Sequence, residues 1–162
     1  GRDVTGVTIS PSQHSYADCR LDGRADIQLR DYRDIDGTYD NIVSIEMREA
    51  VGARYWPSYF DVLKLNLAEG GKILLQVITV KDAFFDTYRT SSDYIRQYVF
   101  PGGMLLSDSV IAEQALDGAQ LDLIAQRGRR AVCVDIAYLF RVHLGRFQRR
   151  LHGSCGAISF RR

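Results

Sequence analysis

The chain has 162 residues, 46% of them hydrophobic and 25% charged. This composition fits one globular domain and excludes a disordered, collagen-like or coiled-coil protein. The net charge of +1 conceals an asymmetry, because residues 1–126 carry 12 basic and 19 acidic side chains, whereas residues 127–162 carry nine arginines and one acid. Such a basic tail is typical of a solvated helix face or of a segment that contacts anionic lipid, and we do not expect a nucleic-acid partner.

The cysteines and histidines indicate the cellular compartment and whether a metal site is expected. Cys19, Cys133 and Cys155 are odd in number and widely spaced, which argues against a disulfide scaffold and for a reducing compartment, the cytoplasm. No secretory signal opens the sequence, and no apolar run approaches the roughly 20 residues of a membrane-spanning helix. His143 and His152 lack ligand-like neighbours, so we expect no metal site.

The first half of the chain alternates short β-branched segments with helical ones. Ser10 is a good N-cap and Pro11 is tolerated at the first helical position, so a strand over residues 3–9 leads into a helix that stops before Asp22. The next predicted elements are a strand over 25–29, a polar loop over 31–37, a strand over 39–45, a helical turn over 49–52 and a helix over 55–67.

The second half begins with a predicted turn at Glu69-Gly70-Gly71 and the strongest strand of the chain, residues 72–80. Residues 82–99 predict one helix, whose aromatic residues are Phe84, Phe85, Tyr88, Tyr94 and Tyr98. The remaining predicted elements are a helix capped by Ser107 and ending near 116, a strand over 121–125 and a helix over 134–151.

Strands that alternate with helices predict an α/β fold with a mostly parallel sheet. Sheets of this kind bind ligands outside the carboxyl ends of their strands. The loops that follow Ile9, Leu29, Ile45 and Val80 should therefore line one edge. This pattern predicts where a site lies and leaves its chemistry open.

Four segments, in this order and spacing, resemble the cyclopropane-fatty-acid synthases, including the mycolic acid cyclopropane synthases. They are Gly6–Gln13 (GVTISPSQ), Asp31–Asp34 (DYRD), Ile42–Gly52 (IVSIEMREAVG) continuing to Arg54–Pro57 (RYWP), and Tyr98–Gly103 (YVFPGG). The resemblance covers residues 3–125 well and 126–162 poorly. It implies a Rossmann-like class I methyltransferase sheet and an enzyme that uses S-adenosylmethionine to add a methylene group across the double bond of an unsaturated phospholipid acyl chain.

The resemblance also assigns cofactor-binding residues. It implies that Thr8, Ile9 and Gln13 bind the ribose of S-adenosylmethionine; the alternative is a plain N-cap and a surface glutamine. Asp31 can accept a hydrogen bond from the adenine amino group while Tyr32 offers a face for stacking. The alternative for these two is a polar loop with one half-buried tyrosine.

The catalytic residues that the resemblance implies are Glu49, Gln76 and Ile78. Methyl transfer to an alkene generates a carbocation, from which a proton must leave, and the family is understood to hold a bicarbonate ion as the base through a glutamate that matches Glu49. The alternative for Glu49 is a surface residue in the first turn of a helix. Gln76 stands where the family often has histidine; its amide can donate but cannot take up a proton at neutral pH. It is equally compatible with an ordinary buried polar residue.

The partners expected from the resemblance are unsaturated phospholipid acyl chains, met by a cytoplasmic protein at the inner membrane surface. In the family, the region of the aromatic residues between 84 and 98 covers the acyl tunnel; here the alternative is plain core packing.

The resemblance fails at both ends of the chain. The chain begins at the second strand of the fold, so its first strand and glycine-rich loop are lacking, and the open sheet position invites association into a homo-oligomer. In the C-terminal segment Asp135 and Phe147 keep the family's spacing, but Ile136 replaces its tyrosine. We therefore expect a partial methyltransferase domain over 1–126 and a divergent basic helical segment over 127–162, together a fragment that is inactive on its own.

Two alternatives to the synthase remain open on the sequence. The first is a related methyltransferase that simply methylates a lipid or small molecule. The second is a catalytically dead remnant that only binds lipid or a partner.

Overall fold

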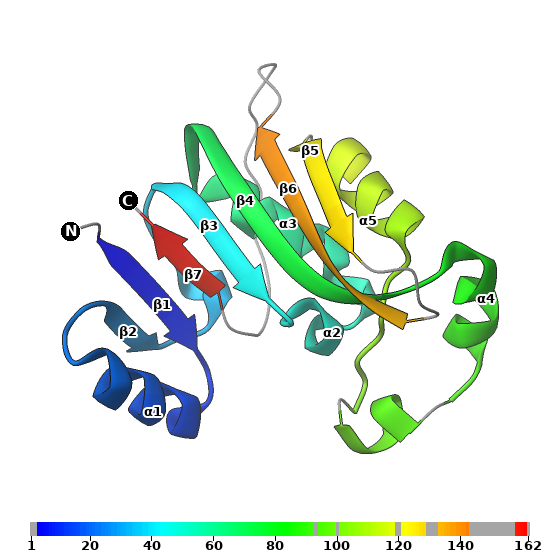
Figure 1. Ribbon diagram of the computed structural model, residues 1–162, viewed down its shortest axis with the longest axis horizontal. Helices are drawn as coiled ribbons and strands as arrows, with labels where there is room; N and C mark the ends of the chain where they lie inside the picture. The colour runs from blue at the N-terminus through cyan, green and yellow to red at the C-terminus, as the bar shows by residue number, and fades with distance from the viewer. Residues whose placement is uncertain are drawn as a thin grey trace.

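The computed structural model describes residues 3–92, 94–99, 101–118, 121–128, 133–142 and 158–161. One sheet of seven strands dominates the molecule, in the order β2-β1-β7-β3-β4-β6-β5 (Figure 1). The strands are β1 (Val4–Thr8), β2 (Asp26–Leu29), β3 (Tyr39–Ile45), β4 (Leu67–Val80), β5 (Leu121–Gly128), β6 (Cys133–Val142) and β7 (Ile158–Arg161). The helices are α1 (Pro11–Leu21), α2 (Arg48–Val51), α3 (Trp56–Leu65), α4 (Asp82–Thr90) and α5 (Asp108–Glu113), with shorter turns η1 (Tyr32–Asp34), η2 (Ala53–Tyr55), η3 (Ile95–Val99) and η4 (Gln114–Gly118).

Four strands of the first half of the chain share one direction. β1 pairs in parallel with β2, and β3 with β4, while β7 is antiparallel to both β1 and β3. The carboxyl ends of β1, β2, β3 and β4 therefore lie at one edge, where α1 and α2 follow β1 and β3 (Figure 1). This topology confirms the predicted α/β fold. Within the described residues, no helix is long and apolar enough to cross a membrane.

The local signals at the start of the chain act as predicted. The Ser10 side chain accepts a hydrogen bond from the Gln13 backbone N–H, and Pro11 opens α1. The helix ends at Asp22, which has the left-handed φ of 47°. β3 has the predicted bounds. The local hydrophobic pattern is enough to predict them, because one face of the strand packs against the core.

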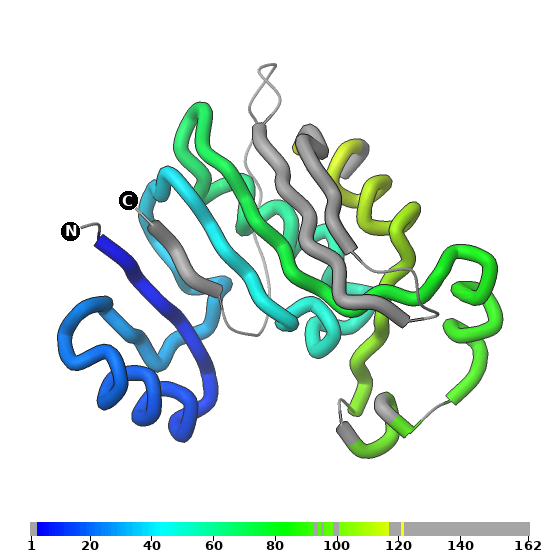
Figure 2. The backbone as a smooth tube through the Cα atoms, viewed as in Figure 1, coloured from blue at the N-terminus to red at the C-terminus, as the bar shows by residue number. Residues whose placement is uncertain are grey.

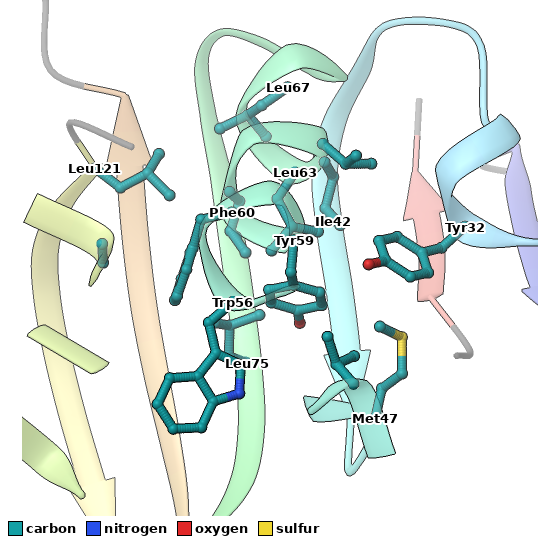
Figure 3. Close-up of a cluster of buried hydrophobic side chains, with 14 of the residues drawn as sticks. Tyr32, Ile42, Met47, Trp56, Tyr59, Phe60, Leu63, Leu67, Leu75 and Leu121 are labelled. Atoms are coloured by element: carbon teal, nitrogen blue, oxygen red, sulfur yellow. The ribbon is translucent and has the colours of Figure 1, made fainter. Parts of the chain in front are cut away.

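The core lies between α3 and the sheet (Figure 3). Tyr59, Phe60 and Leu63 on α3 are fully buried and pack against Ile42 of β3 and Leu75 of β4. Alternate residues of β4 are buried from Gly71 to Thr79, so one face of this strand meets the helix.

The predicted turn at residues 69–71 lies inside β4 and not before it. β4 starts at Leu67, and its register against β3 shifts between Tyr39 and Asn41, which accommodates the two glycines as a bulge. Gly70 has a φ of +74°, and a Cβ on Gly71 would lie 2.8 Å from the carbonyl oxygen of Asp40. The glycines thus allow both the close backbone approach and the sharp bend of the chain at the start of β4 (Figure 1).

The predicted helix over 82–99 is divided. α4 ends at Thr90 and the π-helical turn η3 starts at Ile95. Thr90 and Ser91 donate their hydroxyls to main-chain carbonyls of the preceding turn, which competes with continuation of the helix.

The predicted C-terminal helix is wrong where the structure describes it. Residues 133–142 form β6, whose register against β4 runs from Arg141 opposite Lys72 to Cys133 opposite Val80. Ile136 lies opposite Val77. β6 also pairs with β5, which directly precedes it in the chain, and pairing with β4, which is distant along the chain, favours a strand over the local helical pattern. Residues 143–157, which complete the predicted helix, lie outside the described residues.

The sheet position that the sequence left open is filled by β7. Ser159 lies opposite Gly6 of β1 on one side and opposite Val43 of β3 on the other. Figure 2 traces the backbone as a tube and shows β1 and β3 on the two sides of this position. With β7 in place, β1 and β3 have no unpaired edge toward each other, and the homo-oligomer stays a prediction.

Candidate active site

The polar residues expected at the site meet at one edge of the sheet. Thr8 ends β1, Asp31 follows β2 and Glu49 follows β3, all at the shared carboxyl edge. The structure confirms the prediction that these residues lie at the same end of the sheet. β7 separates β1 from β3. The carboxyl ends of β1 and β3 therefore lie two strand spacings apart, about 10 Å.

Thr8 and Gln13 bind each other. The Thr8 hydroxyl donates to Gln13 Oε1 at 2.8 Å and accepts from the Ser10 N–H at 3.1 Å. Thr8 is buried while Gln13 and Ile9 are exposed. The predicted ribose-binding residues are thus adjacent, but a ligand that uses the Thr8 hydroxyl as a donor has to displace Gln13.

Asp31 is engaged within its own turn. Arg33 donates to both carboxylate oxygens, Nε to Oδ1 at 3.0 Å and Nη2 to Oδ2 at 2.7 Å, and the Arg33 backbone N–H also reaches Oδ1. The bidentate pair is specific in geometry. An adenine amino group would share an acceptor that already has three donors.

Tyr32 lies in the core, whereas the sequence predicted that it would offer a face to the adenine. Its side chain is fully buried, and its ring packs edge-on against Tyr59 with centroids 5.8 Å apart (Figure 3). Burial raises the pKa of the Tyr32 phenol well above its ordinary value. The expected stacking face is therefore turned into the core, because α3 offers an aromatic partner that local sequence does not reveal.

Glu49 is the most unusual acid of the site. Its side chain is 1% exposed on α2. Oε1 accepts the Ile78 backbone N–H at 2.6 Å, whereas Oε2 is buried without a hydrogen-bond partner among the described residues. Burial raises the pKa of the Glu49 carboxyl, against the opposing effect of the Ile78 hydrogen bond. This contact brings together two of the three residues predicted to be catalytic, Glu49 and Ile78, and the surface alternative for Glu49 is wrong.

Glu46 belongs to the same cluster and was missed in the sequence. It is exposed and has a φ of +48°, a left-handed conformation that is uncommon for glutamate. Its N–H donates to the Gln76 carbonyl at 2.8 Å, and Gln76 Nε2 donates to Glu46 Oε1 at 3.4 Å. Gln76 is thus half-buried beside a second carboxylate. Backbone strain of this kind has no signature in the sequence.

Arg48 was also missed. It is 1% exposed, and its guanidinium lies 5.1 Å, 4.9 Å and 4.8 Å from the ring centroids of Trp56, Tyr59 and Phe60. Burial lowers the pKa of the Arg48 guanidinium to about 10. The run Glu-Met-Arg-Glu looks like a solvated turn in the sequence, so no local signal marks this burial.

The aromatic residues of α4 and η3 divide into two sets. Phe84, Tyr94 and Tyr98 are 49%, 69% and 70% exposed. Phe85 packs against the core, and the Tyr88 hydroxyl accepts the Leu105 N–H at 3.2 Å. Only the first set is free to contact a partner, so the alternative of plain core packing holds for Phe85 and Tyr88. Among the residues described, no group of three or more potential metal ligands occurs.

Comparison with known proteins shows the family of this chain. A family model described as mycolic acid cyclopropane synthetase matches residues 1–130. The chain belongs to this family. As a cyclopropane synthetase family member, it carries the partial Rossmann-like methyltransferase sheet expected from its motifs.

Two curated relatives show the range of the family. The chain is 40% identical over 118 residues to tuberculostearic acid methyltransferase of Mycobacterium tuberculosis, covering 70% of this chain and 28% of the relative. It is 38% identical over 113 residues to cyclopropane-fatty-acyl-phospholipid synthase of Escherichia coli, covering 69% and 28%. The family member described here thus spans a little over a quarter of either relative.

Solved structures agree on the fold. A cyclopropane synthase from Mycobacterium tuberculosis superposes with a TM-score of 0.65 at 20% identity, over 76% of this chain and 48% of that one. An S-adenosylmethionine-dependent methyltransferase from Methanosarcina mazei gives 0.65 at 10% identity, over 86% and 82%. These similarities show the class I methyltransferase fold of the family member.

Proposed function

We propose that this chain forms part of an S-adenosylmethionine-dependent enzyme that transfers a methylene group to the double bond of unsaturated phospholipid acyl chains. The observation that carries the proposal is Glu49, a buried carboxyl at the carboxyl edge of the sheet. One oxygen is held by the Ile78 N–H, and the other has no hydrogen-bond partner in the part of the chain that the structure describes. The family match and the names of the two relatives support the lipid substrate class.

The chemistry explains why a buried acid is needed. An alkene carbon takes the methyl group of S-adenosylmethionine, so S-adenosylhomocysteine leaves and a carbocation remains. Loss of a proton from the new methyl group, with ring closure by the C–H electron pair, gives the cyclopropane. The proton acceptor must work where water is excluded, because water would add to the cation.

Bicarbonate fits the residues present and would supply that proton acceptor when bound. Glu49 Oε2 is an orphaned buried acceptor, which suits the O–H of bicarbonate. Glu49 would hold the ion through Oε2, while the Ile78 N–H fixes Oε1 and hence the orientation of the carboxylate. Gln76 lies on the strand that carries Ile78 and can donate its amide at the same edge.

We assign the cofactor to the β1–β2 side of the edge. Thr8 and Gln13 would bind the ribose after opening their mutual hydrogen bond, and Asp31 would accept from the adenine amino group in competition with Arg33. The exposed Ile9 adds an apolar contact beside them. Tyr32 does not contribute a stacking face in this arrangement.

The proposal places the acyl chain and the membrane on the side of α4 and η3. Phe84, Tyr94 and Tyr98 are exposed there, and tyrosines suit the boundary between lipid and water. We expect a peripheral protein at the cytoplasmic face of the inner membrane.

The decisive experiment is a lipid profile of cells that lack their own cyclopropane synthase and express the full-length gene to which this chain belongs. Gas chromatography of fatty acid methyl esters should reveal cyclopropane acids. Glu49→Gln should abolish them while leaving S-adenosylmethionine affinity nearly unchanged, because Glu49 holds the base and not the nucleoside. The exposed Glu69→Gln is the matched control, and retained product in Glu49→Gln contradicts the assignment.

One observation favours a second candidate, simple methylation of the acyl chain. The relative with 40% identity is named a tuberculostearic acid methyltransferase, not a cyclopropane synthase. Methyl-branched acids in the same lipid profile would establish this candidate. No new acid at all, with lipid binding retained, would indicate the non-enzymatic remnant.

A further inference from the structure

Arg48 presents more unsatisfied buried donors than the other described residues. Nε, Nη1 and Nη2 are all buried without a hydrogen-bond partner in the described part of the chain. The three surrounding rings of Trp56, Tyr59 and Phe60 contact the cation through their faces. Ring faces stabilise a cation but do not satisfy its N–H groups, so the guanidinium still lacks hydrogen-bond acceptors.

A buried charge whose N–H groups lack hydrogen-bond acceptors is destabilising, and its retention calls for a reason. Trp56 Nε1 is also buried and unpaired, so two neighbouring side chains hold free donors. Glu49, the next residue after Arg48 on α2, holds one free acceptor, Oε2. The unpaired set thus consists of several donors, a positive charge and one acceptor.

A protonated monoanionic oxyanion complements this set. Bicarbonate has acceptor oxygens for the guanidinium and one O–H for Glu49 Oε2. Without Arg48, bicarbonate and the Glu49 carboxylate would be two anions side by side in a dry site, which is unfavourable. Arg48 supplies the charge that lets both stay ionised.

We propose that Arg48 is a positioning residue for the bicarbonate ion, holding the anion by charge-assisted hydrogen bonds while Glu49 Oε2 accepts the bicarbonate O–H. This inference rests on the proposed function, in that it takes up the ion assigned there to Glu49. It adds a cation that neither the motifs nor the comparisons assign.

The test is thermal unfolding of the 162-residue chain at fixed pH and ionic strength, with and without sodium bicarbonate. Bicarbonate at ten times its Kd should raise the unfolding temperature by about 3–6 °C. Arg48→Met should remove this rise. It should also unfold at the same or a higher temperature than the parent in the absence of bicarbonate, because it replaces an unpaired buried charge with an apolar chain.

A purely structural role for Arg48 predicts the opposite pattern. Arg48→Met would then lower the unfolding temperature and leave the bicarbonate-dependent rise intact, which would overturn the inference but not the role of Glu49. Arg48→Lys keeps the charge and should retain part of the rise, which covers the case in which Arg48→Met does not fold. Arg54→Met is the matched control, since Arg54 lies 4.4 Å over the Tyr55 ring but is exposed.

Sodium nitrate separates specific binding from a general anion effect. Nitrate has the shape and charge of bicarbonate but no O–H, so it should give little or no rise. An equal rise with nitrate would overturn the pairing with Glu49 Oε2. No rise with bicarbonate in the parent chain would overturn both this inference and the assignment of bicarbonate to Glu49, while the lipid profile still tests methyl transfer separately.

Discussion

The two halves of the candidate site handle their polar groups in opposite ways. In the N-terminal unit, formed by β1, α1, β2 and η1, the buried Thr8 pairs with the exposed Gln13, and Asp31 pairs with Arg33. In the central unit, formed by β3, α2, α3 and β4, Arg48 and Glu49 are fully buried and keep unpaired atoms.

This contrast indicates which half is more informative about ligands. Groups that satisfy one another are stable without a ligand, and a ligand must compete with existing hydrogen bonds. Buried groups that lack partners are destabilising as they stand, and a ligand that pairs with them stabilises the fold. The central unit therefore gives the stronger indication of chemistry, although the motif of the N-terminal unit is as clear in sequence.

The largest expected effect tests whether the central unit is the stable core. Phe60→Ala should lower the free energy of unfolding by about 3–5 kcal/mol, because Phe60 is 1% exposed and packs on Tyr59 and Arg48. Chemical denaturation measures this. Tyr16→Ala in α1, where the side chain is 65% exposed, should change it by less than about 0.5 kcal/mol. Equal losses of unfolding free energy in the two variants would contradict the difference between the units.

The second prediction uses the pH dependence of Glu49. Its pKa is raised by burial, so folding favours the protonated form, and the stabilisation it contributes at low pH is lost as pH rises past the ordinary glutamate pKa of about 4.3. Glu49→Gln should therefore be more stable than the parent at pH 7, by about 1 kcal/mol or more. The difference should shrink toward pH 4 in denaturant titrations, and a difference that grows toward pH 4 would contradict the raised pKa.

The third prediction concerns the cap of α1. Ser10→Ala should lower the free energy of unfolding by about 0.5–1 kcal/mol, at the lower end of the usual range because the Ser10 Oγ lies 3.4 Å from the Gln13 N–H. Ser10→Gly should cost only a few tenths of a kcal/mol, since glycine is tolerated at the N-cap. Urea unfolding of both variants decides the matter; a loss above about 2 kcal/mol would show that the N-terminal unit is more tightly coupled to the core than its exposure indicates.

The smallest expected effect is on cofactor affinity. Arg33→Ala frees the Asp31 carboxylate, so S-adenosylmethionine should bind up to about fivefold more tightly, as expected from the modest free energy of an exposed ion pair. Isothermal calorimetry of the 162-residue chain measures the change, with the exposed Arg30→Ala as control. Weaker binding in Arg33→Ala would assign Arg33, rather than Asp31, to the ligand.

The sequence by itself determined the elements whose signals are local. The Ser10-Pro11 start of α1, the bounds of β3 and the strand at residues 72–80 follow from capping preference and hydrophobic pattern, which neighbouring residues decide. The family and the edge that carries Thr8, Asp31 and Glu49 also followed from motifs and from the parallel arrangement.

Only the tertiary structure decided the features that depend on partners distant along the chain. β6 is a strand because the distant β4 pairs with it, and β7 lies between β1 and β3 although its own four residues show no reason for that place. Tyr32 is buried because Tyr59 packs against it. The same holds for Arg48, which the rings of α3 enclose: a charged residue in a polar run looks solvated until the packing of another helix removes it from water.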